Sequence, residues 1–78
     1  MKEDLPPKST IIKGQKVYYD DETKDGVYCL GQDLDFSEAE VFFKHARMYQ
    51  KADFEDDKEG QFTIFYNRGR GVYWIERR

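Results

Sequence analysis

The chain has 78 residues, of which 38% are hydrophobic, 37% charged and 17% aromatic, and its formal net charge at pH 7 is −3. This length accommodates one domain with one modest core. The negative charge argues against sequence-independent binding to nucleic acid, which depends on positive charge, and no apolar run is long enough to cross a bilayer. The single cysteine, Cys29, excludes an intramolecular disulfide and favours a reducing compartment, so we expect a cytoplasmic protein without membrane association.

Residues 1–9 predict a flexible lead-in to a single folded domain over residues 10–78. Pro6 and Pro7 are adjacent and lie among charged residues, a composition that disfavours regular structure. A disordered terminus is favoured there over a docking peptide.

Residues 10–19 and 27–30 predict strands joined by an acidic turn. The first stretch is rich in β-forming residues, and Gly14 predicts a bend or bulge between two short runs. Asp25 and Gly26 supply the positive φ that a hairpin turn needs, after which the chain returns over residues 27–30.

Residues 36–54 carry the only sustained helical pattern. Ser37 is a suitable N-cap, Glu40 stands where it completes a capping box, and Phe36 and Val41 occupy the two positions of a hydrophobic staple. We expect the helix to end near residues 52–54, where the periodicity is lost. An apolar stripe with the helical period comprises Ala39, Phe42, Ala46 and Tyr49.

The apolar arc of this helix is broader than packing on one sheet face usually needs. Val41, Met48 and Ala52 widen it on one side and Phe43 on the other. The narrow polar arc includes a basic row that is more typical of a solvated face than of a binding face. This row comprises Lys44, Arg47 and Lys51.

Residues 61–66 and 72–76 predict two further strands, joined by a turn over residues 67–71. A type I turn followed by Gly69 in the left-handed conformation pairs Tyr66 with Arg70 and Ile64 with Val72. The resulting order, β-β-α-β-β, predicts a small α+β domain with an antiparallel sheet packed on one helix.

Both faces of this last hairpin are apolar and aromatic. In the predicted register one face carries Phe62, Ile64, Tyr66, Val72 and Trp74, and the other carries Thr63, Phe65, Tyr73 and Ile75. One helix covers only one face of a small sheet. Three structures are therefore candidates to cover the second face: the first hairpin folded over a curled sheet, a second copy of the chain, or a docked partner.

The same hairpin gathers Trp, Tyr and Arg, the residues enriched at binding hot spots. We therefore expect a non-enzymatic protein–protein interaction module that binds stoichiometrically. By analogy with small acidic domains that lack catalytic groups, it is an accessory or inhibitor protein of the kind that phages encode. The candidate partner-binding residues are Tyr66, Arg68, Arg70, Tyr73, Trp74, Lys44, Arg47 and Lys51.

Two other kinds of partner are compatible with this hairpin. The alternative function is an RNA-binding or single-stranded nucleic-acid-binding domain, in which bases stack on the rings while Arg68 and Arg70 meet phosphates. A homodimer sealed through the aromatic sheet face is the other arrangement.

No catalytic, cofactor-binding or metal-binding motif is predicted. His45 is the only histidine and has no suitably spaced ligand partners. Cys29 lies in a predicted strand, which is typical of a buried, inert thiol. The acidic runs at residues 20–25 and 53–59 lack the spacing of a calcium-binding loop.

Overall fold

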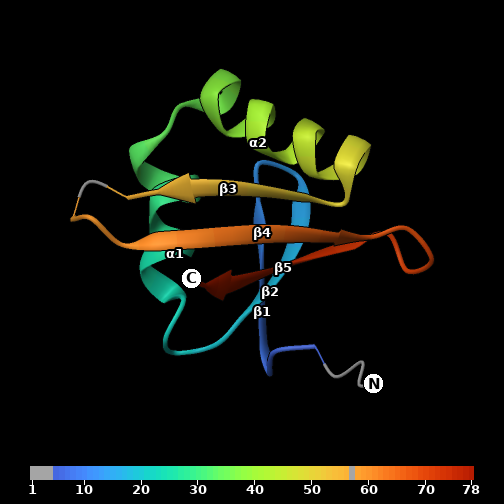
Figure 1. Cartoon of the computed structure of the whole chain (residues 1–78), viewed down its shortest axis with the longest axis horizontal. Coiled ribbons are helices and arrows are strands. Elements are labelled where there is room, and N and C mark those ends of the chain that lie inside the picture. The colour runs from blue at the N-terminus through green and yellow to red at the C-terminus, as the bar shows by residue number, and fades with distance from the viewer. Residues whose placement is uncertain (1–4, 57) are drawn as a thin grey trace.

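The computed structural model describes residues 5–56 and 58–78, and it confirms the α+β class (Figure 1). Within these ranges, a five-stranded sheet is combined with two α-helices and one π-helical turn. The elements in chain order are β1 (Lys8–Ile12), β2 (Gln15–Tyr19), α1 (Lys24–Tyr28), the π-helical turn η1 (Cys29–Asp33), α2 (Phe36–Tyr49), β3 (Lys51–Glu55), β4 (Gln61–Asn67) and β5 (Val72–Arg77).

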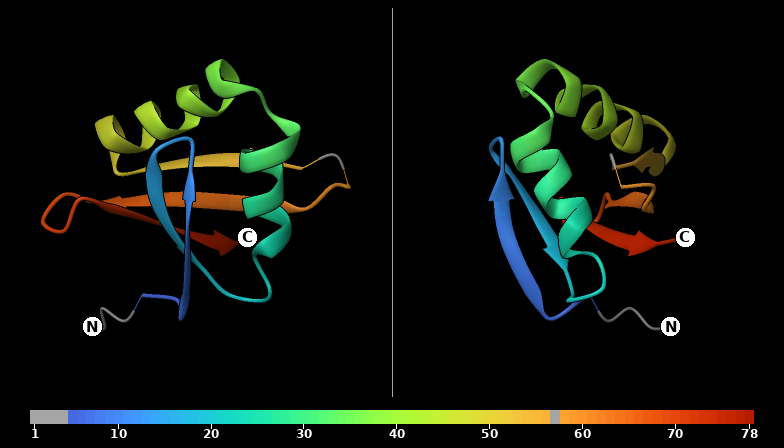
Figure 2. Two further views of the ribbon diagram at one scale, coloured as in Figure 1. Left: turned by 180° about the vertical axis from the view of Figure 1, so that it is seen from behind. Right: turned by 90° about the vertical axis from the view of Figure 1, so that its left-hand side faces the viewer.

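The sheet is mixed, with strand order β1-β2-β5-β4-β3. Strands β2 and β5 run parallel, with Val17 beside Tyr73, and the other three neighbouring pairs are antiparallel. The sheet curls strongly, so that α1 lies between β1 and the strands β3 to β5 while α2 closes one end (Figure 2). The first hairpin therefore curls round the inner face of the sheet, the face on which the helices pack, and leaves the outer face of β4 and β5 uncovered by it (Figure 2).

The first hairpin turns at Lys13 and Gly14, where the prediction placed only a bend or bulge. Both residues have positive φ, 49° and 85°, as a tight two-residue hairpin turn requires. Strand β1 begins at Lys8, inside the predicted lead-in, whereas residues 1–4 lie outside the described residues.

The predicted strand over residues 27–30 is wrong, because this segment is helical. Gly26 lies inside α1 and forms no hairpin turn with Asp25. The buried positions Gly26, Cys29 and Leu30 follow one another at helical spacing. Gly26 packs so closely on the sheet that an added Cβ would lie 3.1 Å from the ring of Phe62.

The N-cap of helix α2 is Asp35, two residues before the predicted cap at Ser37. Asp35 accepts a hydrogen bond from the Glu38 amide (2.8 Å), and the Glu38 carboxylate accepts one from the Asp35 amide (3.1 Å). The capping box is thus built by this pair and not by Ser37 with Glu40. The predicted staple is also wrong, because Phe36 and Val41 are both exposed.

We expect Asp35→Ala to lower the free energy of unfolding by about 1 kcal/mol, because the amides of the first helical turn lose their acceptor. Ser37→Ala is the matched control, since Ser37 caps nothing, and its expected effect is within about 0.5 kcal/mol. Urea denaturation followed by circular dichroism measures both. Equal losses for the two variants would contradict the assigned cap.

The helix ends at Tyr49, short of the predicted residues 52–54. Gln50 adopts the left-handed conformation (φ 76°), a common way to terminate a helix. The chain then forms β3, in which Ala52 and Phe54 are buried while the charged residues that alternate with them, Lys51, Asp53 and Glu55, are exposed. This alternation is typical of a half-buried strand. The prediction had extended the preceding helical pattern over these residues.

The inner face of the sheet and one side of α2 form the core. On α2 the buried residues are Ala39, Phe43 and Ala46, whereas Tyr49, which was predicted in the apolar stripe, is exposed. Phe42 is partly buried, and its ring lies 5.8 Å from that of Phe54. The largest fully buried side chains are Tyr73, Phe43, Phe62, Leu30, Ile64, Ile75 and Val17.

The two strands of the last hairpin are confirmed, but the predicted register is wrong. Tyr66 pairs with Tyr73 and Asn67 with Val72. Gly71, and not Gly69, has the positive φ (69°), and its amide donates to the Asn67 carbonyl (2.7 Å). The true register puts Trp74 on the sheet face opposite to the core.

Candidate protein-binding surface

Three aromatic side chains on adjacent strands form a ladder on the outer face of the sheet. Phe65 on β4 pairs directly with Trp74 on β5, which pairs with Tyr18 on β2. The residues that precede Trp74 and Tyr18 in their strands, Tyr73 and Val17, are buried in the core. Since successive strand residues point to opposite faces, Tyr18, Phe65 and Trp74 point outward, and we call them the outer aromatic ladder.

Both described helices lie on the other side of the sheet. Figure 1 views the outer face of β3, β4 and β5, with α1 and the β1–β2 hairpin behind these strands. Phe65, Trp74 and Tyr18 are each half-buried, because neighbouring side chains cover part of every ring. The ladder is therefore an aromatic surface that solvent still reaches.

The rings of the ladder are held by specific contacts. Phe65 and Trp74 are stacked, with ring centroids 5.1 Å apart and planes inclined by 14°. The Trp74 Nε1–H donates to the Glu76 carboxylate (3.0 Å). The Lys16 ammonium lies 5.3 Å from the centroid of the Tyr18 ring, within the range of a cation–π contact. These contacts fix the orientation of the ladder before any partner arrives.

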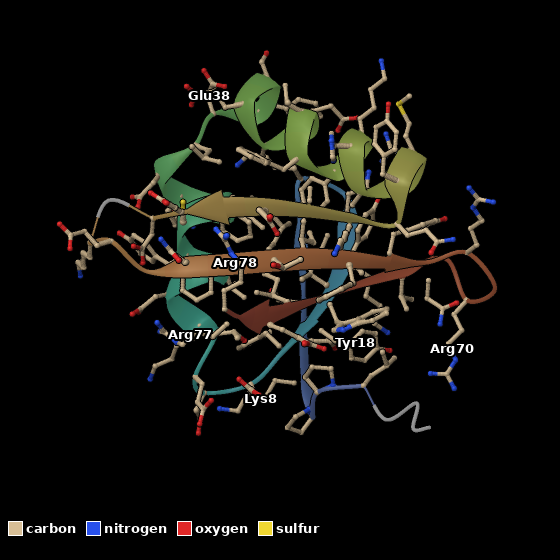
Figure 3. The ribbon with its side chains drawn as sticks, viewed as in Figure 1. Lys8, Tyr18, Glu38, Arg70, Arg77 and Arg78 are labelled. Atoms are coloured by element: carbon tan, nitrogen blue, oxygen red, sulfur yellow. The ribbon has the colours of Figure 1, made fainter. Side chains whose placement is uncertain are left out.

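Along the strands, the outer aromatic ladder has basic residues on one side and acidic residues on the other. Lys51 on β3 stands directly opposite Phe65, and Lys16 lies next to Tyr18. Arg68 and Arg70 are exposed in the loop between β4 and β5, and Figure 3 shows Arg70 extending away from the sheet. The side of the ladder nearer this loop is therefore basic.

The opposite side of the ladder carries acidic groups. Thr63 pairs with both Asp53 and Glu76 across the sheet. The Thr63 hydroxyl donates to Asp53 (2.7 Å), and a guanidinium nitrogen of Arg78 lies 3.8 Å from the same carboxylate. The outer face thus has one basic end and one mixed, partly neutralised end.

Three of the sequence-predicted binding residues turn inward and serve the core. Tyr73 is 1% exposed, and its hydroxyl accepts a hydrogen bond from Arg47 (2.7 Å). Arg47 also pairs with Glu40 (3.1 Å), while the ring of Tyr66 lies 4.8 Å from that of Tyr73. This group ties α2 to the sheet.

The electrostatics of the same group fit a structural role. Burial raises the pKa of the Tyr73 phenol, and the Arg47 guanidinium that donates to it acts against this rise. The hydrogen bonds to Tyr73 and Glu40 raise the pKa of Arg47. Arg47 and Tyr73 therefore keep their usual protonation states near neutral pH.

The remaining predicted residues are distributed over two parts of the surface. Trp74, Lys51, Arg68 and Arg70 lie on or beside the outer face, whereas Lys44 is exposed on α2 and is not part of it. The basic row is therefore divided between elements. Sequence reasoning missed Phe65 and Tyr18 as partners of Trp74, which only the correct register reveals.

The described residues offer little else that suggests chemistry. Among them, no group of three or more His, Cys, Asp or Glu side chains is placed to hold a metal ion. His45 is exposed, with Nδ1 3.1 Å from the Lys51 carbonyl oxygen, and Cys29 is buried with Sγ 3.9 Å from the Glu55 carbonyl oxygen. No helix in the described ranges is long and apolar enough to span a membrane.

No protein-family model matches the chain, and comparisons with curated proteins and with solved structures also gave no match.

Proposed function

We propose that this protein is a non-enzymatic binding module that docks stoichiometrically on a partner protein through the outer aromatic ladder. The observation that carries the proposal is the position of three adjacent aromatic rings on a sheet face that neither described helix covers. The three rings, although each half-buried, form one continuous row on this face, and aromatic residues supply much of the binding energy at protein interfaces.

The charges around the ladder indicate the chemistry of the partner. Lys16, Lys51, Arg68 and Arg70 surround the end nearer the β4–β5 loop. A partner with an apolar centre and an acidic patch beside it would match this arrangement, because complementary charges steer association and set orientation. We expect the association rate to fall as ionic strength rises.

The ring geometry favours a protein over single-stranded nucleic acid. Bases bind to such surfaces by stacking on open ring faces, but Phe65 and Trp74 stack on each other and so use one face of each ring. Glu76, which accepts from Trp74, also places a carboxylate where a phosphate would be repelled. The edges of the stacked rings are better suited to apolar contact with a protein surface.

Affinity capture from a native lysate tests the proposal, with wild-type protein compared with Phe65→Ala combined with Trp74→Ala. We expect the double variant to lose at least about tenfold of the recovered partner, because hot-spot truncations cost more than about 1.4 kcal/mol of binding. Phe36→Ala is the matched control, since Phe36 is a 62% exposed aromatic residue on α2. Equal recovery of every protein by wild type and double variant would refute the proposal.

A filter-binding assay with single-stranded DNA and RNA over a salt series tests the alternative function. We expect no binding even at low salt. Binding that weakens steeply with salt and is lost in both Trp74→Ala and Arg70→Ala would replace the protein-binding proposal. We further propose an accessory or inhibitor role by analogy with other small acidic domains. The single cysteine favours a reducing compartment, so the proposed location is cytoplasmic.

A further inference from the structure

We propose that two copies of this chain associate through the free edge of β1, with the two β1 strands paired antiparallel about a two-fold axis at Thr10. The inference goes beyond the proposed function, because it uses the edge of the sheet and leaves the outer aromatic ladder available to a partner.

Strand β1 presents unpaired backbone groups along one side. It ends the sheet and has β2 as its neighbour among the described strands. Ile12 and Gln15 close the two-residue turn and so exchange two backbone hydrogen bonds. Along the pairing of β1 with β2, hydrogen-bonded residue pairs then alternate with pairs that are not hydrogen-bonded. Ser9 and Ile11 fall between these pairs, so their N–H and C=O groups point away from β2.

The two edges of the sheet differ in how they are protected. At the β3 edge the exposed residues Lys51, Asp53 and Glu55 are all charged, and α2 packs against the strand. At the β1 edge Lys8 is the only charged residue of the strand, and no proline lies within it. Exposed edges normally carry such charges or prolines to prevent pairing, so the β1 edge has the composition of one that pairs.

Open space lies beside this edge. A groove of about 730 Å³ runs between β1 and α1, and its apolar lining includes Ile12, Val27 and Tyr28. Figure 2 shows β1 at the margin of the molecule, with α1 set to one side of it. The groove can therefore receive an added strand and part of its side chains.

The two-fold register satisfies the exposed backbone groups of both copies. An axis at Thr10 places Ser9 opposite Ile11 of the second copy, and Ile11 opposite Ser9 of the second copy. All four residues direct their N–H and C=O groups outward, so each opposite pair can exchange two hydrogen bonds. Self-complementarity of this kind is the condition for a closed symmetric dimer.

Side chains and charges also agree with this register. Lys8, which pairs with Asp21 within its own chain, would stand opposite Ile12 of the second copy, so no like charges are placed face to face. Ile11 is 64% exposed in the single chain and would be covered across the new strand pair. The second copy accounts for this exposed apolar side chain without requiring another protein.

The expected dimer is weak, because a single five-residue strand pair with part of a groove forms a small interface. We expect a dissociation constant on the order of 100 µM. Sedimentation equilibrium from about 10 µM to about 1 mM covers this range. The apparent mass of wild-type protein should rise from that of the 9.4 kDa monomer towards twice that value.

Two variants locate the contact. Ile11→Pro removes an outward N–H without breaking the pairing with β2, and Thr10→Lys places two positive charges opposite each other across the axis. Both should be largely monomeric at about 1 mM, which corresponds to a loss of at least about a hundredfold in affinity. Circular dichroism checks that they are folded, and Thr10→Lys keeps every backbone donor if Ile11→Pro does not fold.

Three results would overturn the inference. The first is a wild-type protein that stays monomeric over the whole concentration range, even if its β1 edge pairs with a strand of another protein. The second is a dimer that survives both edge variants. The third is a dimer that is lost in the Phe65→Ala and Trp74→Ala double variant, since that places the contact on the outer aromatic ladder. A monomer that still binds a partner protein would leave the proposed function standing.

Discussion

Phe43→Ala should lower the free energy of unfolding by about 3–5 kcal/mol, the range found for truncating a buried phenylalanine. The Phe43 side chain is fully buried between α2 and the sheet, and its ring meets that of Tyr73 edge-on at 4.9 Å. No nearby element is free to collapse into the space, because Phe43 lies at the centre of the contact between helix and sheet. Urea denaturation at pH 7 measures the loss.

Phe65→Ala is the matched control for this experiment, because it removes the same side chain from the opposite face of the sheet. Phe65 is half-buried and its main contact is the stacked ring of Trp74. The expected loss is about 1–2 kcal/mol, from partial burial and one aromatic pair. A loss equal to that of Phe43→Ala would mean that the outer face is part of the folding core and not a surface.

Gly26→Val should destabilise the protein by about 3 kcal/mol, at the upper end for overpacking a core. A Cβ on Gly26 would lie 3.1 Å from two ring carbons of Phe62 and 3.3 Å from Phe54. Both rings are themselves buried and stacked, with centroids 5.5 Å apart, so neither can move aside without disturbing the other. Thermal and urea denaturation would report the change.

Gly31→Ala provides the comparison for that substitution. Gly31 belongs to η1, directly after α1, and the nearest atom to an added Cβ is a methyl carbon of Ile12 at 4.0 Å. Since glycine costs up to about 1 kcal/mol in a helix relative to alanine, Gly31→Ala should leave stability unchanged or raise it. A Gly26→Val variant as stable as Gly31→Ala would contradict the close packing of α1 on β4.

The sequence predicted elements well where a local pattern and the tertiary structure agree. The β-forming runs of β4 and β5 and the glycine-rich turn between them located both strands of the last hairpin, although not their register. The apolar spacing of Ala39 and Ala46 located α2. The class of the fold followed from these elements. Long-range packing overrides the local preference elsewhere, as in α1, where β-forming Val27 and Tyr28 are helical and Gly26 packs closely on Phe62.

The candidate surface was harder to predict, because it depends on register. Moving the turn glycine from Gly69 to Gly71 shifts the pairing by an odd number of residues, which exchanges the faces of one strand relative to the other. Tyr73 and Trp74 thereby take opposite roles, one in the core and one outside. Tyr18 lies beside Trp74 in the outer aromatic ladder only because β2 pairs in parallel with β5. No local pattern in the sequence signals this pairing.

The most direct test is photo-cross-linking from p-benzoylphenylalanine placed at position 65, compared with the same group at position 36. Position 65 lies in the outer aromatic ladder, and position 36 is an exposed aromatic site on α2. We predict a discrete cross-linked protein from position 65 that is absent from position 36 and is competed away by unlabelled wild-type protein. Cross-linking from position 36 alone, or competition by the Phe65→Ala and Trp74→Ala double variant as effective as by wild type, would contradict the proposed binding surface.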